Sequence, residues 1–100
     1  MAASQAVTIP EAFRADVERA VQILRAGGCT DVFVFGSVAA GDAEAADLDL
    51  AVRGCPPDRF FHLLGRLLME LDHPVDLVDL DVGGLFAEYL EQEGELVQVG

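Results

Sequence analysis

Basic side chains are scarce in this sequence. Six Lys and Arg residues face 18 Asp and Glu residues, which gives a formal net charge of −12. Surfaces that bind nucleic acids place Lys and Arg against the phosphate backbone and release its counterions, so direct nucleic-acid binding is not expected. A negatively charged substrate would need a bridging metal ion. Carboxylates, which are abundant here, are ligands that hard cations such as Mg²⁺ prefer.

Cysteine is also rare, and long apolar runs are missing. Cys29 and Cys55 are too few for a disulfide framework or a zinc site, so we expect two reduced thiols at small, buried or half-buried positions. No apolar run approaches the roughly 20 residues of a membrane helix, and the N-terminal segment lacks the organisation of a signal peptide. A soluble, cytoplasmic protein with no membrane partner is therefore expected.

The 100 residues, 52% of them hydrophobic, are expected to form one domain with a real core, in which residues 1–7 are frayed. Hydrophobic periodicity predicts strands at 31–35 and 47–52, a third strand after Pro74, and a short last strand in ELVQV. Helices are predicted from Thr8 or Pro10 to Ala26, from an N-cap at Asp58 to about Leu71, and over residues 85–93, with a short helical turn at 37–41. This order predicts an α/β (α+β) fold, a small mixed β-sheet with helices packed on it.

Two aspartates at alternate positions stand out. Asp47 and Asp49 open an apolar run whose leucines and valine point to the opposite face. Aspartate is unfavourable in strands, so the pair needs a reason. One interpretation is a strand with a face wetted by solvent, as in many antiparallel sheets. The other is a metal site, because Cα atoms about 6.5 to 7 Å apart hold parallel carboxylates that suit two divalent ions about 4 Å apart.

A metal site of this kind normally has a third acid, and the segment HPVDLVDLD offers candidates. Alternation along a strand puts Asp76 on the face opposite to Asp79 and Asp81. At most one of these two sets can therefore face Asp47 and Asp49. Asp76 is the favoured third acid, and Asp79 is the alternative.

The segment FGSVAAG places a glycine–serine turn directly after a predicted strand. Gly36 permits close approach, and backbone N–H groups with the Ser37 hydroxyl can hold phosphate oxygens. The segment is neither a Walker P-loop nor a hydrolase elbow, no motif places His62 or His73 to activate the serine, and the acids fail the EF-hand pattern. Alone it would be an ordinary turn; beside the two acids it indicates a phosphate cradle next to a metal site.

Gly36-Ser37, a spacer containing Gly41, Asp47-Leu48-Asp49-Leu50 and the later VDLVDL together resemble the minimal nucleotidyltransferases of the DNA polymerase β superfamily. The resemblance runs from the first predicted helix to EYLEQEGELVQ, and implies the polymerase β-like nucleotidyltransferase fold. It implies that Gly36 and Ser37 hold a nucleoside triphosphate. It also implies that Asp47, Asp49 and Asp76 are catalytic and bind two Mg²⁺ ions, while NMP passes from ATP or another NTP to an acceptor and pyrophosphate leaves.

The resemblance also implies a partner. The chain leaves no room for a second domain that binds an acceptor, and minimal nucleotidyltransferases resemble one half of a pair whose other half is a small helical HEPN protein, often a toxin ribonuclease. The first hypothesis is an antitoxin that transfers AMP to its HEPN partner. In this chemistry the metals would neutralise phosphates that a protein of charge −12 otherwise repels.

Two alternatives stay open. The spacer VAAGDAEAA carries no basic residue, although family members often have one soon after the Gly-Ser pair. In the first alternative the nucleotide site is vestigial, and the chain is a non-catalytic acidic binding module that neutralises a basic HEPN partner. A small-molecule nucleotidyltransferase of the aminoglycoside-modifying kind would need a homodimer to build its acceptor pocket. A homodimer would also cover helix stripes that so short a chain leaves exposed.

Overall fold

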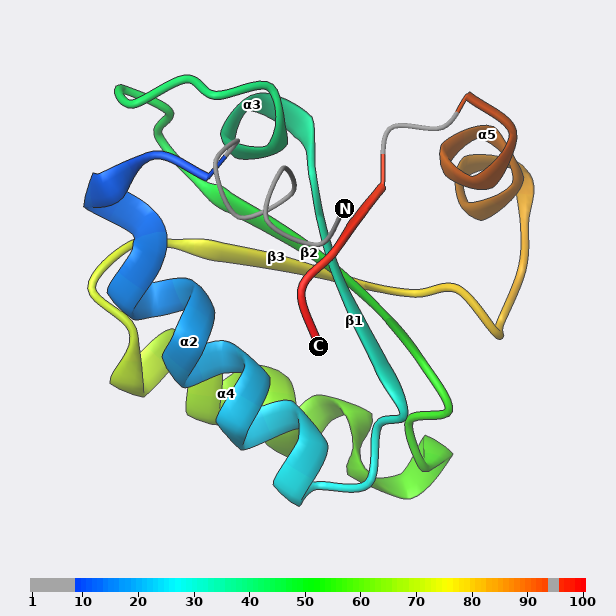
Figure 1. Cartoon of the computed structure of the whole chain (residues 1–100). Helices are drawn as coiled ribbons and strands as arrows, with labels where there is room; N and C mark the ends of the chain where they lie inside the picture. Colours follow the sequence, from blue (N-terminus) through cyan, green and yellow to red (C-terminus); the bar gives the residue numbers. More distant parts are fainter. Residues whose placement is uncertain (1–8, 94–95) are drawn as a thin grey trace.

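A four-stranded mixed sheet organises the protein, and its strands lie in the order β3-β2-β1-β4. The computed structural model describes residues 9–93 and 96–100, so the start predicted to be frayed lies outside the described residues. β1 pairs antiparallel with β2 and with β4, whereas β2 and β3 are parallel. The strands are β1 (Asp31–Phe35), β2 (Leu48–Arg53), β3 (Val75–Asp79) and β4 (Val97–Gln98) (Figure 1). The predicted mixed sheet is confirmed.

The helices agree with the periodicity except at one boundary. They are α2 (Glu11–Ala26), the short α3 (Gly36–Ala39), α4 (Phe60–Glu70) and α5 (Leu85–Glu93). The prediction that Asp58 caps the second long helix is wrong: Asp58 lies inside the 3-10 turn η1 (Pro57–Arg59), and Arg59 occupies the N-cap position of α4 without a side-chain hydrogen bond. Pro57, with its φ fixed near helical values, starts the turn early and draws Asp58 into it.

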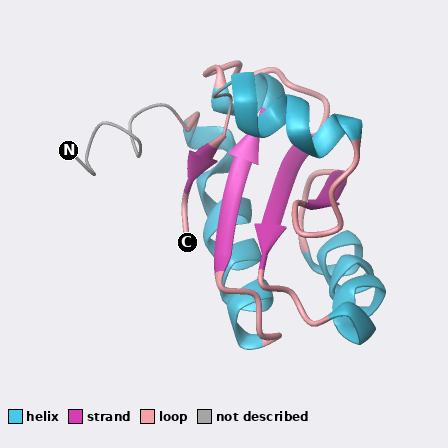
Figure 2. Ribbon diagram, turned by 90° about the vertical axis from the view of Figure 1, so that its right-hand side faces the viewer, coloured by secondary structure: helices cyan, strands magenta, loops and turns pink. Residues whose placement is uncertain are grey.

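The helices cover the two faces of the sheet unequally (Figures 1 and 2). The larger core lies between α2, α4 and one face, where the inward side chains of β1 and β2 are fully buried: Val32, Val34, Leu48, Leu50 and Val52. The second face is covered by α5, whose Ala87 and Leu90 pack with Phe35 and Ala51. The alternation predicted for β2 therefore holds, with the apolar side chains in the larger core and Asp49 on the second face.

The parallel pairing of β2 with β3 depends on α4. Parallel neighbours cannot be joined by a tight hairpin and need a crossover, which is usually helical. α4 fills this role and anchors itself by burying Leu63 and Leu67. The first contact between the strands is the hydrogen bond from the Leu48 N–H to the Pro74 carbonyl (2.8 Å), and the register that follows sets Asp49 beside Asp76.

Asp16 ties α2 to the segment that leads into β3. Its buried carboxylate accepts hydrogen bonds from the backbone N–H groups of Asp72 (3.0 Å) and His73 (2.9 Å). Since an ionised carboxylate only accepts, Nδ1 of the His73 ring donates a third bond over 2.7 Å. The same ring lies against Phe13, with ring centroids 4.2 Å apart. Burial acts to raise the pKa of Asp16, but the hydrogen bonds outweigh it and the pKa is lowered.

The two cysteines are free and buried, as predicted. Burial, followed by the effect of the neighbouring Cys55 thiol and the Asp79 charge, raises the pKa of Cys29 to about 12. Cys29 therefore stays a protonated, weakly reactive thiol at neutral pH. In the described part of the chain, no helix is both long enough and apolar enough to cross a membrane.

We expect Asp16→Asn to lower the free energy of unfolding at neutral pH by about 1–3 kcal/mol, because an amide turns NH₂ hydrogens towards backbone donors. Since folding lowers the pKa of Asp16, its contribution is complete above the ordinary pKa of 3.8 and is lost as the pH falls below that value. Urea unfolding of the variant and the parent should therefore converge on acidification. Glu18→Gln, at an exposed position of the same helix, is the control; a difference that stays constant with pH would contradict this role.

Candidate functional site

Gly36 is the junction on which the candidate site is built. It follows the last residue of β1 and has a φ of +71°, a conformation that side chains disfavour. A Cβ atom added at this position would collide with the Asp49 carboxylate oxygen Oδ2, which is side-chain rather than backbone. The positive φ therefore favours glycine at this position, and a larger residue would also have to displace the Asp49 carboxylate.

α3 turns the backbone after Gly36 so that Ser37 faces solvent. Its anchor is Val38, which is fully buried, while Gly36 and Ser37 are exposed. The Asp42 N–H closes the turn by donating to the Ser37 carbonyl (3.0 Å). The first N–H groups of a helix have no intrahelical acceptors. The junction thus combines an exposed glycine, a serine hydroxyl and the first N–H groups of a short helix. The phosphate-binding role of Gly36 and Ser37 stays a prediction.

The structure brings Asp49 and Asp76 together on adjacent strands. They are register partners in the parallel β2–β3 pair, and on its other side Asp49 is the partner of Phe35, the last residue before Gly36. Asp47 is exposed and lies two positions before Asp49, directly before the first residue of β2. Asp79 lies three positions after Asp76 in the same strand, so the two side chains are on opposite faces of the sheet. Asp79 lines a cleft beside α4. Of the two candidates for a third acid, only Asp76 is paired with Asp49.

Burial and two neighbouring carboxylates raise the cost of ionising Asp49. Burial, then the charge of Asp76 and then that of Asp47, raises the pKa of Asp49 above its ordinary value of 3.8. Asp49 is half-buried, whereas Asp47 and Asp76 are exposed. A bound cation would lower this cost, because its positive charge stabilises the ionised carboxylate.

The carboxylates fit a metal ion that arrives with its substrate. Among residues 9–93 and 96–100, no three His, Cys, Asp or Glu side chains are grouped so as to hold a metal ion by themselves. Mg²⁺ usually takes one or two protein carboxylates and completes its octahedron with phosphate oxygens and water. Asp49 and Asp76 supply that donor chemistry. The ligand role of Asp47, Asp49 and Asp76 stays a prediction.

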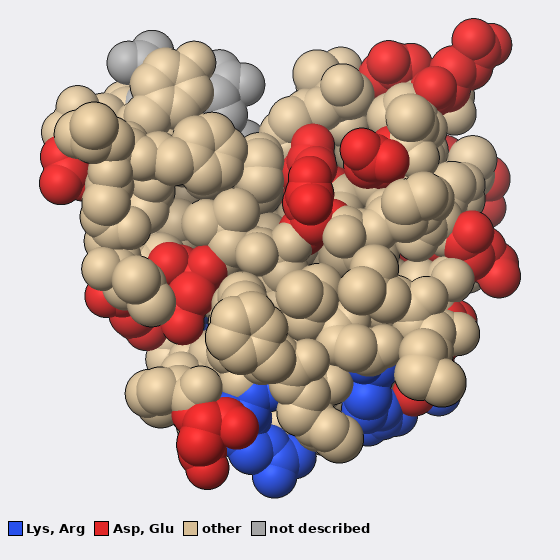
Figure 3. Space-filling view, turned by 180° about the vertical axis from the view of Figure 1, so that it is seen from behind, with Lys and Arg blue, Asp and Glu red and all other residues tan. Residues whose placement is uncertain are grey.

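Positive charge is absent from the loop that links α3 to β2. Residues 38–46 contain no Arg or Lys, and Asp42 uses its carboxylate locally to accept the Glu44 N–H (2.9 Å). On the face shown in Figure 3 the basic atoms gather at one end, while acidic atoms are spread over the rest. Charge compensation at Asp49 is therefore expected from a bound cation rather than from this loop.

One feature had no signal in the sequence. A cleft lies at the other end of β2 and β3, built from Cys55, Phe61, Asp79 and other residues of two separate segments, 55–61 and 79–83. Only the two acids in it were candidates, and then as metal ligands. Because no single segment carries its pattern, only the folded chain reveals this cleft. It does not lie beside Asp49, so it offers no acceptor pocket there.

These elements form a mixed sheet with a glycine–serine turn after one strand and acids on the next two, an arrangement that can be compared with solved structures. The structure is similar to a chain of the toxin–antitoxin MntA–HepT crystal structure, with 21% sequence identity, coverage of 85% of this chain and 69% of that chain, and a TM-score of 0.61. A toxin–antitoxin structure with AMP-PNP gives 24% identity, coverage of 82% and 70%, and a TM-score of 0.65.

A third similar structure is a tri-AMPylated Shewanella oneidensis HEPN toxin in complex with MNT antitoxin, with 22% identity, coverage of 85% and 69%, and a TM-score of 0.62. No family model and no curated protein matches the sequence. The likenesses in structure show the fold alone: they confirm the predicted mixed sheet with helices packed on it, a fold shared with the MNT antitoxin structures.

We expect Gly36→Ala to destabilise the protein more than Gly83→Ala. Both glycines have positive φ, so each change costs about 1–2 kcal/mol in backbone strain. Only at position 36 does the added Cβ also meet Asp49, because nothing lies within 4 Å of a Cβ at Gly83. Urea unfolding measures both costs.

A double-mutant cycle isolates the collision. The Asp49 Cβ would lie 3.5 Å from the new Cβ, an ordinary contact, so Asp49→Ala removes the clash. In that background the cost of Gly36→Ala should fall to that of Gly83→Ala. Equal costs of the two glycine changes in the parent chain would contradict this prediction, and would show that the Asp49 carboxylate moves away from the new Cβ at little cost.

Proposed function

We propose that this chain is a Mg²⁺-dependent nucleotidyltransferase that transfers AMP from ATP to a HEPN-type partner protein. The observation that carries the proposal is the alignment of Asp49 with Asp76 on parallel strands, directly against the β1–α3 junction at Gly36. Two carboxylates next to exposed backbone donors suit a metal–triphosphate complex, because the metal binds both the acids and the phosphates.

The similar solved structures support the choice of nucleotide and acceptor. One of them contains AMP-PNP, an ATP analogue, and another contains a tri-AMPylated HEPN toxin bound to its MNT antitoxin. Both share the fold of this chain at 22–24% sequence identity. By analogy of fold, ATP is the substrate proposed here, and a side-chain hydroxyl of the partner is the acceptor.

Each predicted residue then has a task. Gly36 and Ser37 hold phosphate oxygens through backbone N–H groups and the hydroxyl. Asp47, Asp49 and Asp76 bind Mg²⁺, which would neutralise the phosphate charge and stabilise the entering and leaving oxygens. The raised pKa of Asp49 means that its ionised form is destabilised without a cation. A bound Mg²⁺ would offset part of this destabilisation.

Asp76 is the residue best placed to receive the acceptor. It is exposed and lies on the edge strand β3, whereas Asp49 is half-buried between β1 and β3. The acceptor hydroxyl attacks the α-phosphorus, the bond to pyrophosphate breaks, and the hydroxyl proton passes to a carboxylate, for which we assign Asp76. AMP is thereby joined to the partner through a new phosphate ester.

A second function is favoured by charge alone. The absence of Arg and Lys from residues 38–46 and the net charge of −12 suit an acidic module that neutralises a basic HEPN partner without catalysis. In that case the partner binds in a salt-sensitive manner and carries no AMP. The two functions differ in whether label from ATP becomes attached to the partner.

The test is incubation with Mg²⁺, α-labelled ATP and the protein encoded by the neighbouring gene. We expect label on the partner, and Asp49→Asn should slow labelling by about 100-fold or more, because it removes a carboxylate ligand of the Mg²⁺ that would stabilise the transition state. Asp72→Asn removes the same charge from an exposed loop position and should have little effect.

Binding of Mg²⁺–ATP, followed by calorimetry without the partner, separates the steps. Asp49→Asn and Asp76→Asn should both weaken nucleotide binding in the presence of Mg²⁺. Absence of label, together with tight complex formation that salt abolishes, would leave the acidic module as the function.

A further inference from the structure

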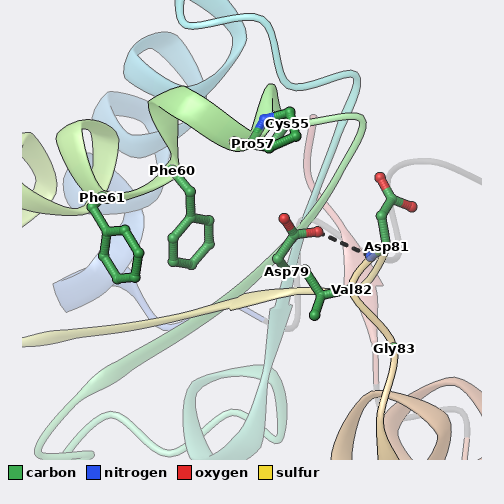
Figure 4. Close-up of a pocket in the computed structure, with 8 residues that line it drawn as sticks. All are labelled: Cys55, Pro57, Phe60, Phe61, Asp79, Asp81, Val82 and Gly83. Atoms are coloured by element: carbon green, nitrogen blue, oxygen red, sulfur yellow. Dashed lines mark hydrogen bonds between the residues drawn. The ribbon is translucent and has the colours of Figure 1, made fainter.

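A cleft of about 560 Å³ opens at the end of the sheet away from Asp49 and Asp76. Those two acids lie near the start of β2 and β3, whereas the cleft follows the C-terminal ends of the same parallel strands. Figure 4 shows the aromatic residues of α4 on one side of the cleft and the turn after β3 on the other. We call it the acidic cleft; its lining is Cys55, Pro57, Phe60, Phe61, Asp79, Asp81, Val82 and Gly83.

The two acids of the cleft are held by the backbone but not neutralised. Oδ1 of Asp79 accepts the Asp81 N–H (2.9 Å), and Oδ2 of Asp81 accepts the Gly54 N–H (2.5 Å). In the described part of the chain, no ion pair includes either acid, and their second oxygens have no hydrogen-bond donor. Fixed carboxylates with open acceptor positions, set among apolar walls, favour a cationic ligand.

Exposed apolar side chains continue away from the cleft on both sides. Phe61 at its mouth is 80% exposed and Val82 is 81% exposed. Beyond Phe61, α4 exposes Leu68 on the same face, since it lies two turns further on. Beyond Val82, α5 exposes Leu85, Phe86 and Tyr89. Exposed apolar side chains near a polar centre are typical of a protein-binding site.

We propose that the acidic cleft is a docking site for a protein partner that inserts an arginine side chain flanked by apolar residues. The guanidinium reaches Asp79 and Asp81, its planar group lies against Phe60 or Phe61, and its neighbours cover the exposed surfaces of α4 and α5. Charge complementarity selects this occupant: the carboxylates in the cleft are negative, and so is the protein as a whole, at −12.

Other occupants fit less well. A second copy of this chain also carries −12, and four of its six basic residues, Arg14, Arg19, Arg53 and Arg66, already form ion pairs within the described structure. A small organic cation would fill the cleft but leave the apolar surfaces of α4 and α5 uncovered. The proposal does not rest on nucleotide transfer, since no residue of the acidic cleft belongs to the candidate nucleotide site.

The probe is an acetylated and amidated peptide, Leu-Arg-Leu, titrated into the isotope-labelled protein and followed through backbone amide resonances. We expect saturable shifts at Gly54, Cys55 and Gly83 and none at Gly36 or Ser37. The matched peptide with citrulline in place of arginine keeps the shape and loses the charge. It should bind about tenfold more weakly or worse, as expected when a hydrogen bond to a charged group is lost.

Variants of the protein locate the site. Asp79→Asn retains the oxygen that accepts the Asp81 N–H and should weaken peptide binding by about tenfold. Phe61→Ala, at a position 80% exposed, should weaken it without affecting folding, whereas Met69→Ala, 87% exposed on the same helix but outside the cleft, should not. Binding of Mg²⁺–ATP should be unchanged in Phe61→Ala, so failure of this proposal and failure of nucleotide transfer are distinguishable.

The docking site would be overturned by any of these results: no shift at the cleft, equal binding of the citrulline peptide, binding that Asp79→Asn leaves unchanged, or argininamide alone binding as tightly as the peptide. The result with argininamide would make the cleft a small-cation pocket. Resonances that move with protein concentration and stop moving in Phe61→Ala would identify a second copy as the occupant, and would equally contradict a basic partner.

Discussion

The parallel register of β2 and β3 is the constraint on which the candidate site depends. A slip of one residue would turn the side chains of β3 to the other face, placing Leu77 or Val75 beside Asp49 instead of Asp76. Groups outside the two strands help to set this register. α4 supplies the crossover, and the buried carboxylate of Asp16 fixes the backbone that leads into β3. A residue of α2 thus positions an acid that is 60 positions further along the chain.

The two ends of this strand pair have different chemistry. At the start, carboxylates crowd a glycine turn and raise the pKa of Asp49, so that end favours a cation bound together with phosphates. At the C-terminal ends of the two strands, carboxylates lie among aromatic and aliphatic side chains, where a cation with an apolar stem fits. The same strands therefore serve as a rigid spacer between the proposed nucleotide site and the proposed docking site.

Much of the fold was accessible from the sequence because the strands and helices obey simple periodicities. Alternation in β2 predicted correctly which side chains enter the core, and parity separated Asp76 from Asp79. What local pattern cannot supply is which strands pair: the adjacency of Asp49 and Asp76 needs the crossover. The interaction of Asp16 with His73 and the lining of the acidic cleft were missed for the same reason, since their members are far apart in sequence. Asp58 was misplaced because Pro57 starts a 3-10 turn.

β3 is an edge strand, and its outer backbone groups have no neighbouring strand in the described structure. Exposed edges invite pairing with another chain, and charged side chains are a common protection against it. Asp76 and Asp79 stand on opposite faces of this edge. If two copies aligned their β3 strands, either face would bring carboxylates together without a compensating cation. The acids that we propose bind ligands on β3 are thus also expected to disfavour pairing through its open edge.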